Sequence, residues 1–298
     1  MKWLARLFSP RQPERPAPAK RAAAATSSIP PPPAAEATPF LPWLLGCGPL
    51  TDAPVAGPEQ RALDALDKTL ALPALPDDLL PRATALIPQL LALLRQTELP
   101  VPALAQRVAK DMVLAAEVLR LASSPYYRAQ GAVTDLAQAI ALIGVEGLQT
   151  VIARVVLKPM YDAPPGPLSA RAGTRLWDHA EALAWHTAAF AGAAGSPAFD
   201  GYLAGLLHDS GWSMLLRVLD RAGVAPPLPP TAAFAAAAAE RAHRLFGRAA
   251  QRWTITEGFT SFGADARERS LATSPHALAE ALRQALPLAM SDVSSGAA

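Results

Sequence analysis

Cysteine, charge and long apolar runs are all scarce in this chain of 298 residues. The single cysteine, Cys47, excludes an internal disulfide framework and a cysteine-built zinc cluster, and it fits a reducing, cytoplasmic setting. Charged residues make up 17% and the formal net charge is +2, so global electrostatics give no reason to expect a nucleic-acid partner. No apolar run reaches about 18 residues, and the N-terminus lacks the apolar core of a signal peptide, so we expect neither a membrane-spanning helix nor export.

Strand-like alternation and internal repeats are missing as well. Hydrophobic residues make up 51%, much of it alanine, which favours helix over strand. From about residue 60 onward apolar side chains recur at three- and four-residue spacing, as in Leu63, Leu66 and Leu70. The pattern predicts an all-α fold. The expected helices are 61–72, one that is capped by Asp77 or Asp78 and runs through Leu94, 103–109, 112–122, 135–143, 145–157, 174–194, 201–208, 212–221, 234–253 and 274–289.

Local signals place several helix ends. Asp111, Thr134 and Asp200 are predicted N-caps for the helices that follow them, and Gly144 is expected to end a helix in the left-handed conformation. A Pro/Gly-containing loop at 162–172 separates two predicted lobes. We therefore expect a first lobe over about 65–160, a second over about 170–260, and a C-terminal helical extension with a frayed tail over 261–298.

Residues 1–60 are predicted to be a tail. They hold 13 of the 31 prolines, and 9–39 contain little but Pro, Ala, Ser and Arg, a composition typical of disorder. Residues 40–45 are more apolar than a linker requires, and we expect them to dock on the folded part. Near the start, hydrophobic residues alternate with basic ones, which indicates either a weak membrane or partner contact or a frayed terminus. These are Trp3, Leu4, Leu7 and Phe8.

One constellation carries candidate chemistry. A small, apolar helix ends at His208-Asp209, and an adjacent imidazole and carboxylate are a common basis for binding a divalent metal ion. His179, in the long helix upstream, is a further candidate ligand. His186 is seven residues on and roughly 10 Å further along the helix axis, so at most one of the two can join the pair. The candidate metal ligands are therefore His179, His208 and Asp209.

Five blocks in order resemble a known family. Residues 72–76 (LPALP), 110–127, 133–148, 177–179 with 204–211, and 240–253 resemble the HDOD domain, a relative of the HD superfamily of metal-dependent phosphohydrolases. The resemblance covers roughly residues 65–260. Met112 and Ser123 depart from it, since the family usually has proline and asparagine at these places.

The resemblance implies a largely lost hydrolase site. A hydrolytic metal centre needs about four or more protein ligands with an open position for water, and this chain supplies three. His243 and His276 follow the pair, but neither lies in a His-His or His-x-x-His arrangement, and His243 is expected to be an exposed helix residue. Asp209 is expected to cap the next helix or to hold the ring of His208. We therefore predict no catalytic residue, no cofactor and a vestigial pair.

The sequence thus favours a bacterial, cytoplasmic signalling module that binds a protein partner or a small ligand without catalysis. The alternative is a metal-dependent phosphohydrolase acting on a nucleotide or phosphodiester. A third interpretation makes the chain a scaffold whose tail attaches it to a membrane or partner. Phosphate-binding glycine loops and nucleophile elbows do not occur, and Cys47 has no nearby histidine, so other common chemistries are not supported.

Overall fold

The computed structural model describes residues 40–295 apart from 81, 125–132, 134 and 163–165. Over this range the chain is helical and forms no strand, with one isolated parallel bridge between Thr51 and Thr231, which confirms the all-α prediction. The predicted disorder of residues 1–39 lies outside the described part of the chain. So does the predicted contact through Trp3, Leu4, Leu7 and Phe8.

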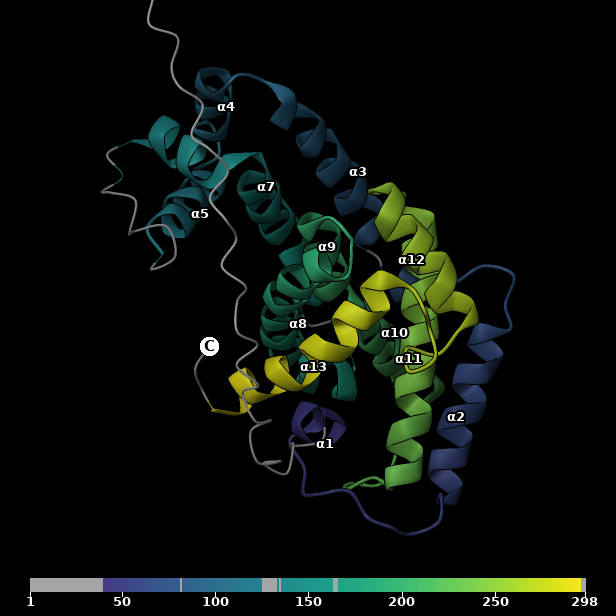
Figure 1. Cartoon of the computed structure of the whole chain (residues 1–298). Coiled ribbons are helices and arrows are strands. Elements are labelled where there is room, and N and C mark those ends of the chain that lie inside the picture. The colour runs from purple at the N-terminus through teal and green to yellow at the C-terminus, as the bar shows by residue number, and fades with distance from the viewer. Residues whose placement is uncertain (1–39, 81, 125–132, 134, 163–165, 296–298) are drawn as a thin grey trace, which may run out of the picture. The chain divides into compact units, whose positions relative to one another are not determined.

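The helices follow one another along the chain as Figure 1 shows. They are α1 (Phe40–Leu45), α2 (Gly57–Leu70), η2 (Asp77–Leu79), α3 (Ala83–Leu94), η3 (Arg95–Glu98), α4 (Val101–Val108), α5 (Met112–Ala122), α7 (Leu136–Leu157), η4 (Lys158–Tyr161), α8 (Pro167–Ala193), α9 (Ala198–His208), α10 (Ser210–Ala222), α11 (Ala232–Trp253), α12 (Glu257–Glu268) and α13 (Ala277–Ser295).

The helices pack in two groups. In the first, α3, α4 and α5 pack on α7, and Leu114, Val118 and Leu121 of α5 are buried. In the second, α8 packs on α9, α10 and α13, and α11 packs on α10 and α12. Helix α2 packs on α10 and α11, so placing the start of the first lobe at residue 65 was wrong for this helix.

The predicted tail is too long at its C-terminal end. Leu41, Leu44 and Leu45 of α1 are buried and the helix packs on α8, which confirms that residues 40–45 dock. Glu59 is also buried, and its carboxylate accepts hydrogen bonds from the backbone N–H of Ala56 and of Thr231. Residues 40–60 therefore belong to the folded unit.

Predicted helix ends succeed where the signal is local. The Asp111 carboxylate accepts from the N–H groups of Val113 and Leu114, as expected for an N-cap. Gly144 interrupts α7 with a φ of 70°. Thr134 lies outside the described residues, and Asp135 caps α7 instead.

Other predicted ends are wrong because distant residues decide them. Helix α8 begins at Pro167, inside the predicted loop, since the Asp220 carboxylate accepts from the N–H groups of Leu168 and Ser169. Asp200 lies within α9 and does not cap it; its carboxylate accepts from the Thr256 hydroxyl at 2.6 Å. Helix α12 was not predicted at all.

One helical stretch passes a membrane-span test by length and composition alone. Leu136–Tyr161 has a mean hydropathy of 1.8, and 56% of its most apolar window is buried inside the fold. It is the helix on which α3, α4 and α5 pack. Its apolar character is therefore that of a core helix.

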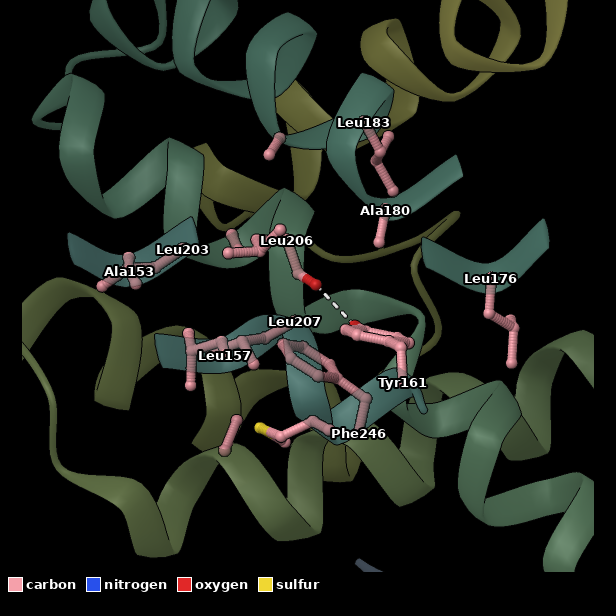
Figure 2. Packing of buried hydrophobic residues seen from close by; sticks show 14 of the residues in the cluster. Ala153, Leu157, Tyr161, Leu176, Ala180, Leu183, Leu203, Leu206, Leu207 and Phe246 are labelled. Atoms are coloured by element: carbon pink, nitrogen blue, oxygen red, sulfur yellow. Dashed lines mark hydrogen bonds between the residues drawn. The ribbon is translucent and has the colours of Figure 1, made fainter. Parts of the chain in front are cut away.

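The C-terminal end of α9 lies in a buried apolar core. The Tyr161 hydroxyl donates to the carbonyl of Leu206 at 2.5 Å, among Leu157, Leu207 and Phe246 (Figure 2).

Glycine lets α9 approach α8 closely. A Cβ on Gly205 would lie 2.6 Å from the Cα of Ala184, and this close crossing brings the C-terminal end of α9 beside α8.

Candidate functional site

Four buried side chains meet where α8, α9, α10 and α11 come together. His208 is the last residue of α9, Asp209 joins α9 to α10, His179 lies on α8 and His243 on α11. Their exposed fractions range from 0% for His179 to 6% for His208. We refer to these four residues as the His–Asp cluster.

The carboxylate of Asp209 is the centre of the cluster. Its Oδ2 lies 2.6 Å from Nδ1 of His179, within hydrogen-bond distance, and its Oδ1 lies 3.6 Å from Nδ1 of His208. Nε2 of His208 is in turn 3.2 Å from Nδ1 of His243. The cluster is therefore a chain in which Asp209 contacts two imidazoles and a third continues one arm.

The surroundings set the charges. Burial acts to raise the pKa of Asp209, but the neighbouring His179 and His208 outweigh it and hold this pKa below its usual value. Burial, reinforced by His208, lowers the pKa of His243 to about 3. At neutral pH the cluster thus contains a carboxylate and, at His243, an uncharged imidazole.

These charges assign the protons. A carboxylate only accepts, so Nδ1–H of His179 donates to Asp209, and the negative charge also favours the proton of His208 on Nδ1. Nε2 of His208 is then an acceptor, and Nδ1–H of His243 donates to it. In their neutral forms His179 and His243 each keep a lone pair on Nε2. Neither Nε2 has a hydrogen-bond partner within the described part of the chain.

A pocket of about 360 Å³ lies beside the cluster. His179, His208 and His243 line it, and its other lining residues come from α1, α10, α11, α13 and the segment before α13. These are Phe40, Trp212, Ala239, Glu240, Leu271, Leu286, Pro287 and Met290. The lone-pair nitrogens thus belong to side chains that face a hollow of ligand size.

Helix α1 covers one side of this pocket. The ring of Phe40 lies 4.6 Å from that of His179 and 5.2 Å from that of Trp212, measured between ring centres. Two arginines of α8 hold the helix by donating to its carbonyls, Arg175 to Leu44 at 3.2 Å and Arg171 to Leu45 at 3.4 Å. The segment just after the predicted disordered region is therefore a wall of the site.

The members of the cluster are hydrogen-bonded to one another. Within the ranges that the structure describes, no group of three or more His, Cys, Asp or Glu side chains is placed to hold one ion. The reason is visible in the distances, since the Oδ2 of Asp209 and the Nε2 of His208 are directed at other members of the cluster. The predicted candidates His179, His208 and Asp209 do meet, but as hydrogen-bond partners.

The prediction for His243 was wrong. It is 3% exposed, and its ring lies 5.5 Å from that of His208 and 6.2 Å from that of Phe262. The spacing held a usable signal, because His243 is three residues before Phe246, whose apolar side chain lies on the buried face of α11. His243 was predicted to be exposed because an imidazole is polar.

The remaining predicted residues fall elsewhere. His186 does not join the cluster, as its position along the helix predicted, and its Nε2 lies 2.7 Å from the carboxylate of Asp292. Nδ1 of His276 accepts from the N–H of Leu278. The Asp209 side chain makes no capping hydrogen bond to α10, so the prediction that it caps this helix was wrong. Its carboxylate lies closer to the ring of His179 than to that of His208.

Comparison with known proteins agrees with the resemblance seen in the sequence. The HDOD domain family matches residues 80–226, which include His179, His208 and Asp209 but end before His243. A crystal structure of an HDOD domain protein of unknown function from Geobacter sulfurreducens is 20% identical, with a TM-score of 0.48, and the match covers 78% of this chain and 77% of that one.

A second solved structure, named as a candidate signal transduction protein from Marinobacter aquaeolei VT8, is 19% identical with a TM-score of 0.41. The match covers 80% of this chain and 55% of that one. No protein of curated function matches. The family match therefore shows that residues 80–226 of this chain are similar to an HDOD domain.

Proposed function

We propose that this protein is a non-catalytic signalling module of the bacterial cytoplasm that acts by binding a small ligand or a protein partner. The observation that carries the proposal is the inward hydrogen bonding of the His–Asp cluster. Asp209 contacts two imidazoles, and one of these contacts a third. A hydrolase of the HD type would instead direct these atoms at a metal ion and keep a position open for water.

The electrostatics support the same reading. Asp209 is buried and ionised, and the Nδ1–H of His179 donates to its Oδ2. Rearranging it to ligate a metal would break its hydrogen bond to His179 and leave that imidazole without its buried partner. The cluster therefore favours a structural and binding role over a hydrolytic one.

Metal-dependent hydrolysis is the alternative to be tested. The full chain is incubated with bis(p-nitrophenyl) phosphate and, in separate reactions, Mn²⁺, Fe²⁺, Co²⁺ or Zn²⁺. We expect the rate to equal that of the metal ion alone. The comparison variant is His208→Gln/Asp209→Asn, which keeps polar side chains of similar size. Turnover by the wild type that this variant loses, while remaining folded, would overturn the proposal.

A further inference from the structure

The pocket beside the His–Asp cluster combines apolar walls with buried ring nitrogens that have no hydrogen-bond partner among the described residues. The walls include Phe40 and Trp212, with Leu271, Leu286 and Met290 on the opposite elements. On the histidine side, Nε2 of His179 and Nε2 of His243 are buried and have no hydrogen-bond partner within the described residues. A buried polar atom without a partner is costly, so each nitrogen gains from a group that fills this space.

The proton assignment sets what that group must be. Each arm of the cluster begins at the Asp209 carboxylate and passes an N–H toward it. In the tautomers that make these contacts, Nε2 of His179 and Nε2 of His243 therefore end their arms as acceptors. An acceptor needs a donor, so an O–H or N–H group of a ligand is complementary to either nitrogen.

The charge around the pocket disfavours an anion. Among the lining residues that the structure describes there is no Lys or Arg, whereas Glu240 lies on the exposed rim and the Asp209 carboxylate lies behind the histidines. A phosphate or carboxylate would meet lone pairs and like charge without a cationic partner. An uncharged ligand meets neither obstacle.

We propose that this pocket binds an uncharged, largely apolar small molecule that presents a hydroxyl or N–H donor to Nε2 of His179 or of His243. The proposal rests on the binding role given above and specifies its ligand class. A volume of about 360 Å³ is near the lower end for ligand pockets, roughly 300–1,000 Å³, and suits a molecule of about two fused rings.

Three matched probes test it on the full chain labelled with ¹⁵N-histidine. 2-Naphthol has the donor, naphthalene lacks it, and 2-naphthoate carries an anion on the same ring system. We expect 2-naphthol to bind at least about tenfold more tightly than naphthalene, the gain of one hydrogen bond to a buried acceptor, and 2-naphthoate to bind more weakly than 2-naphthol. The Nε2 resonance of His179 or of His243 should shift with 2-naphthol and not with naphthalene.

A pair of surface variants locates the binding. Ala239 lines the rim and is exposed, so Ala239→Trp should block the entrance and weaken 2-naphthol binding at least about tenfold without unfolding the chain. Ala236 is an exposed position of the same helix outside the pocket, so Ala236→Trp should leave binding unchanged.

Several results would overturn the proposal. These are equal affinity for naphthalene and 2-naphthol, tighter binding of 2-naphthoate, binding indifferent to Ala239→Trp, or no binding of any probe. None of them would restore the hydrolase alternative, which depends on metal-dependent turnover. The probe experiments therefore test the ligand class, whereas metal-dependent turnover tests the proposed function.

Discussion

Asp209, at the junction of α9 and α10, lies 2.6 Å from Nδ1 of His179, thirty residues earlier on α8. Its chain neighbour His208 is further away, at 3.6 Å between Nδ1 and Oδ1. The side chains adjacent in the sequence are therefore not the closest pair in space. Asp209 and His179, the pair that forms only in the folded chain, organise the cluster. Removing this pair should therefore lower the free energy of unfolding.

Replacing Asp209 with asparagine should destabilise the protein by about 3 kcal/mol or more, because it removes one partner of a buried, charge-assisted pair. The matched control is Asp292→Asn. Asp292 pairs with His186 in a partly exposed position, so its loss should cost less than about 1 kcal/mol. Urea unfolding measures the free energy of unfolding of both variants. Equal losses would show that the buried pair contributes no more to stability than the partly exposed pair.

Acid should unfold the protein partly through His243. Its pKa is about 3 when folded against about 6.5 when unfolded, so the unfolded chain binds more protons between these values. Stability is then present above about pH 6.5 and is lost as the pH falls toward 3, at up to about 1.4 kcal/mol per pH unit for this one group.

The variant His243→Asn isolates this contribution. It keeps an N–H near the position of Nδ1 but cannot titrate, so the free energy of unfolding should fall less steeply between pH 6.5 and 4.5 than in the wild type. Chemical denaturation at a series of pH values measures both slopes. Identical slopes would mean that His243 does not titrate differently in the folded and unfolded chains.

The crossing of α9 over α8 should not tolerate a single added methyl group. A Cβ on Gly205 would lie 2.6 Å from both the Cα of Ala184 and the carbonyl oxygen of Leu183. Because backbone atoms must move, Gly205→Ala should destabilise by about 1–3 kcal/mol or more. Gly192→Ala, exposed on α8 with nothing within 4 Å, should be neutral or stabilising by up to about 1 kcal/mol. Thermal unfolding that ranks the two variants in the opposite order would contradict the crossing.

Helix α1 should contribute to stability despite its six residues. Leu44 is fully buried against the second lobe, so Leu44→Ala should cost about 2–4 kcal/mol. Leu288→Ala, at an exposed position of α13, should change the free energy of unfolding by less than about 0.5 kcal/mol. Urea titration measures both, and a small effect at Leu44 would mean that α1 is not docked.

Local signals in the sequence were enough for much of the fold. The cap at Asp111 and the break at Gly144 depend on neighbouring residues only, and both predictions were correct. The start of α8 depends on Asp220, whose carboxylate reaches Leu168 from another helix. No local pattern encodes that contact.

The site was predictable only in part for the same reason. His179, His208 and Asp209 were identified as a group, and they meet. Which nitrogen faces which oxygen depends on how closely α8 and α9 cross, and that follows from Gly205 against Ala184. The burial of His243 depends on α11 lying across the end of α9, which helical spacing alone did not determine.

Elemental analysis of protein purified without chelators decides whether the His–Asp cluster holds a metal ion. We predict far less than one transition-metal ion per chain in the wild type, with no difference from His208→Gln/Asp209→Asn or from His186→Gln, which removes a histidine outside the cluster. About one metal ion per chain in the wild type and in His186→Gln, lost only in the double variant, would contradict this prediction and identify the cluster as a metal centre.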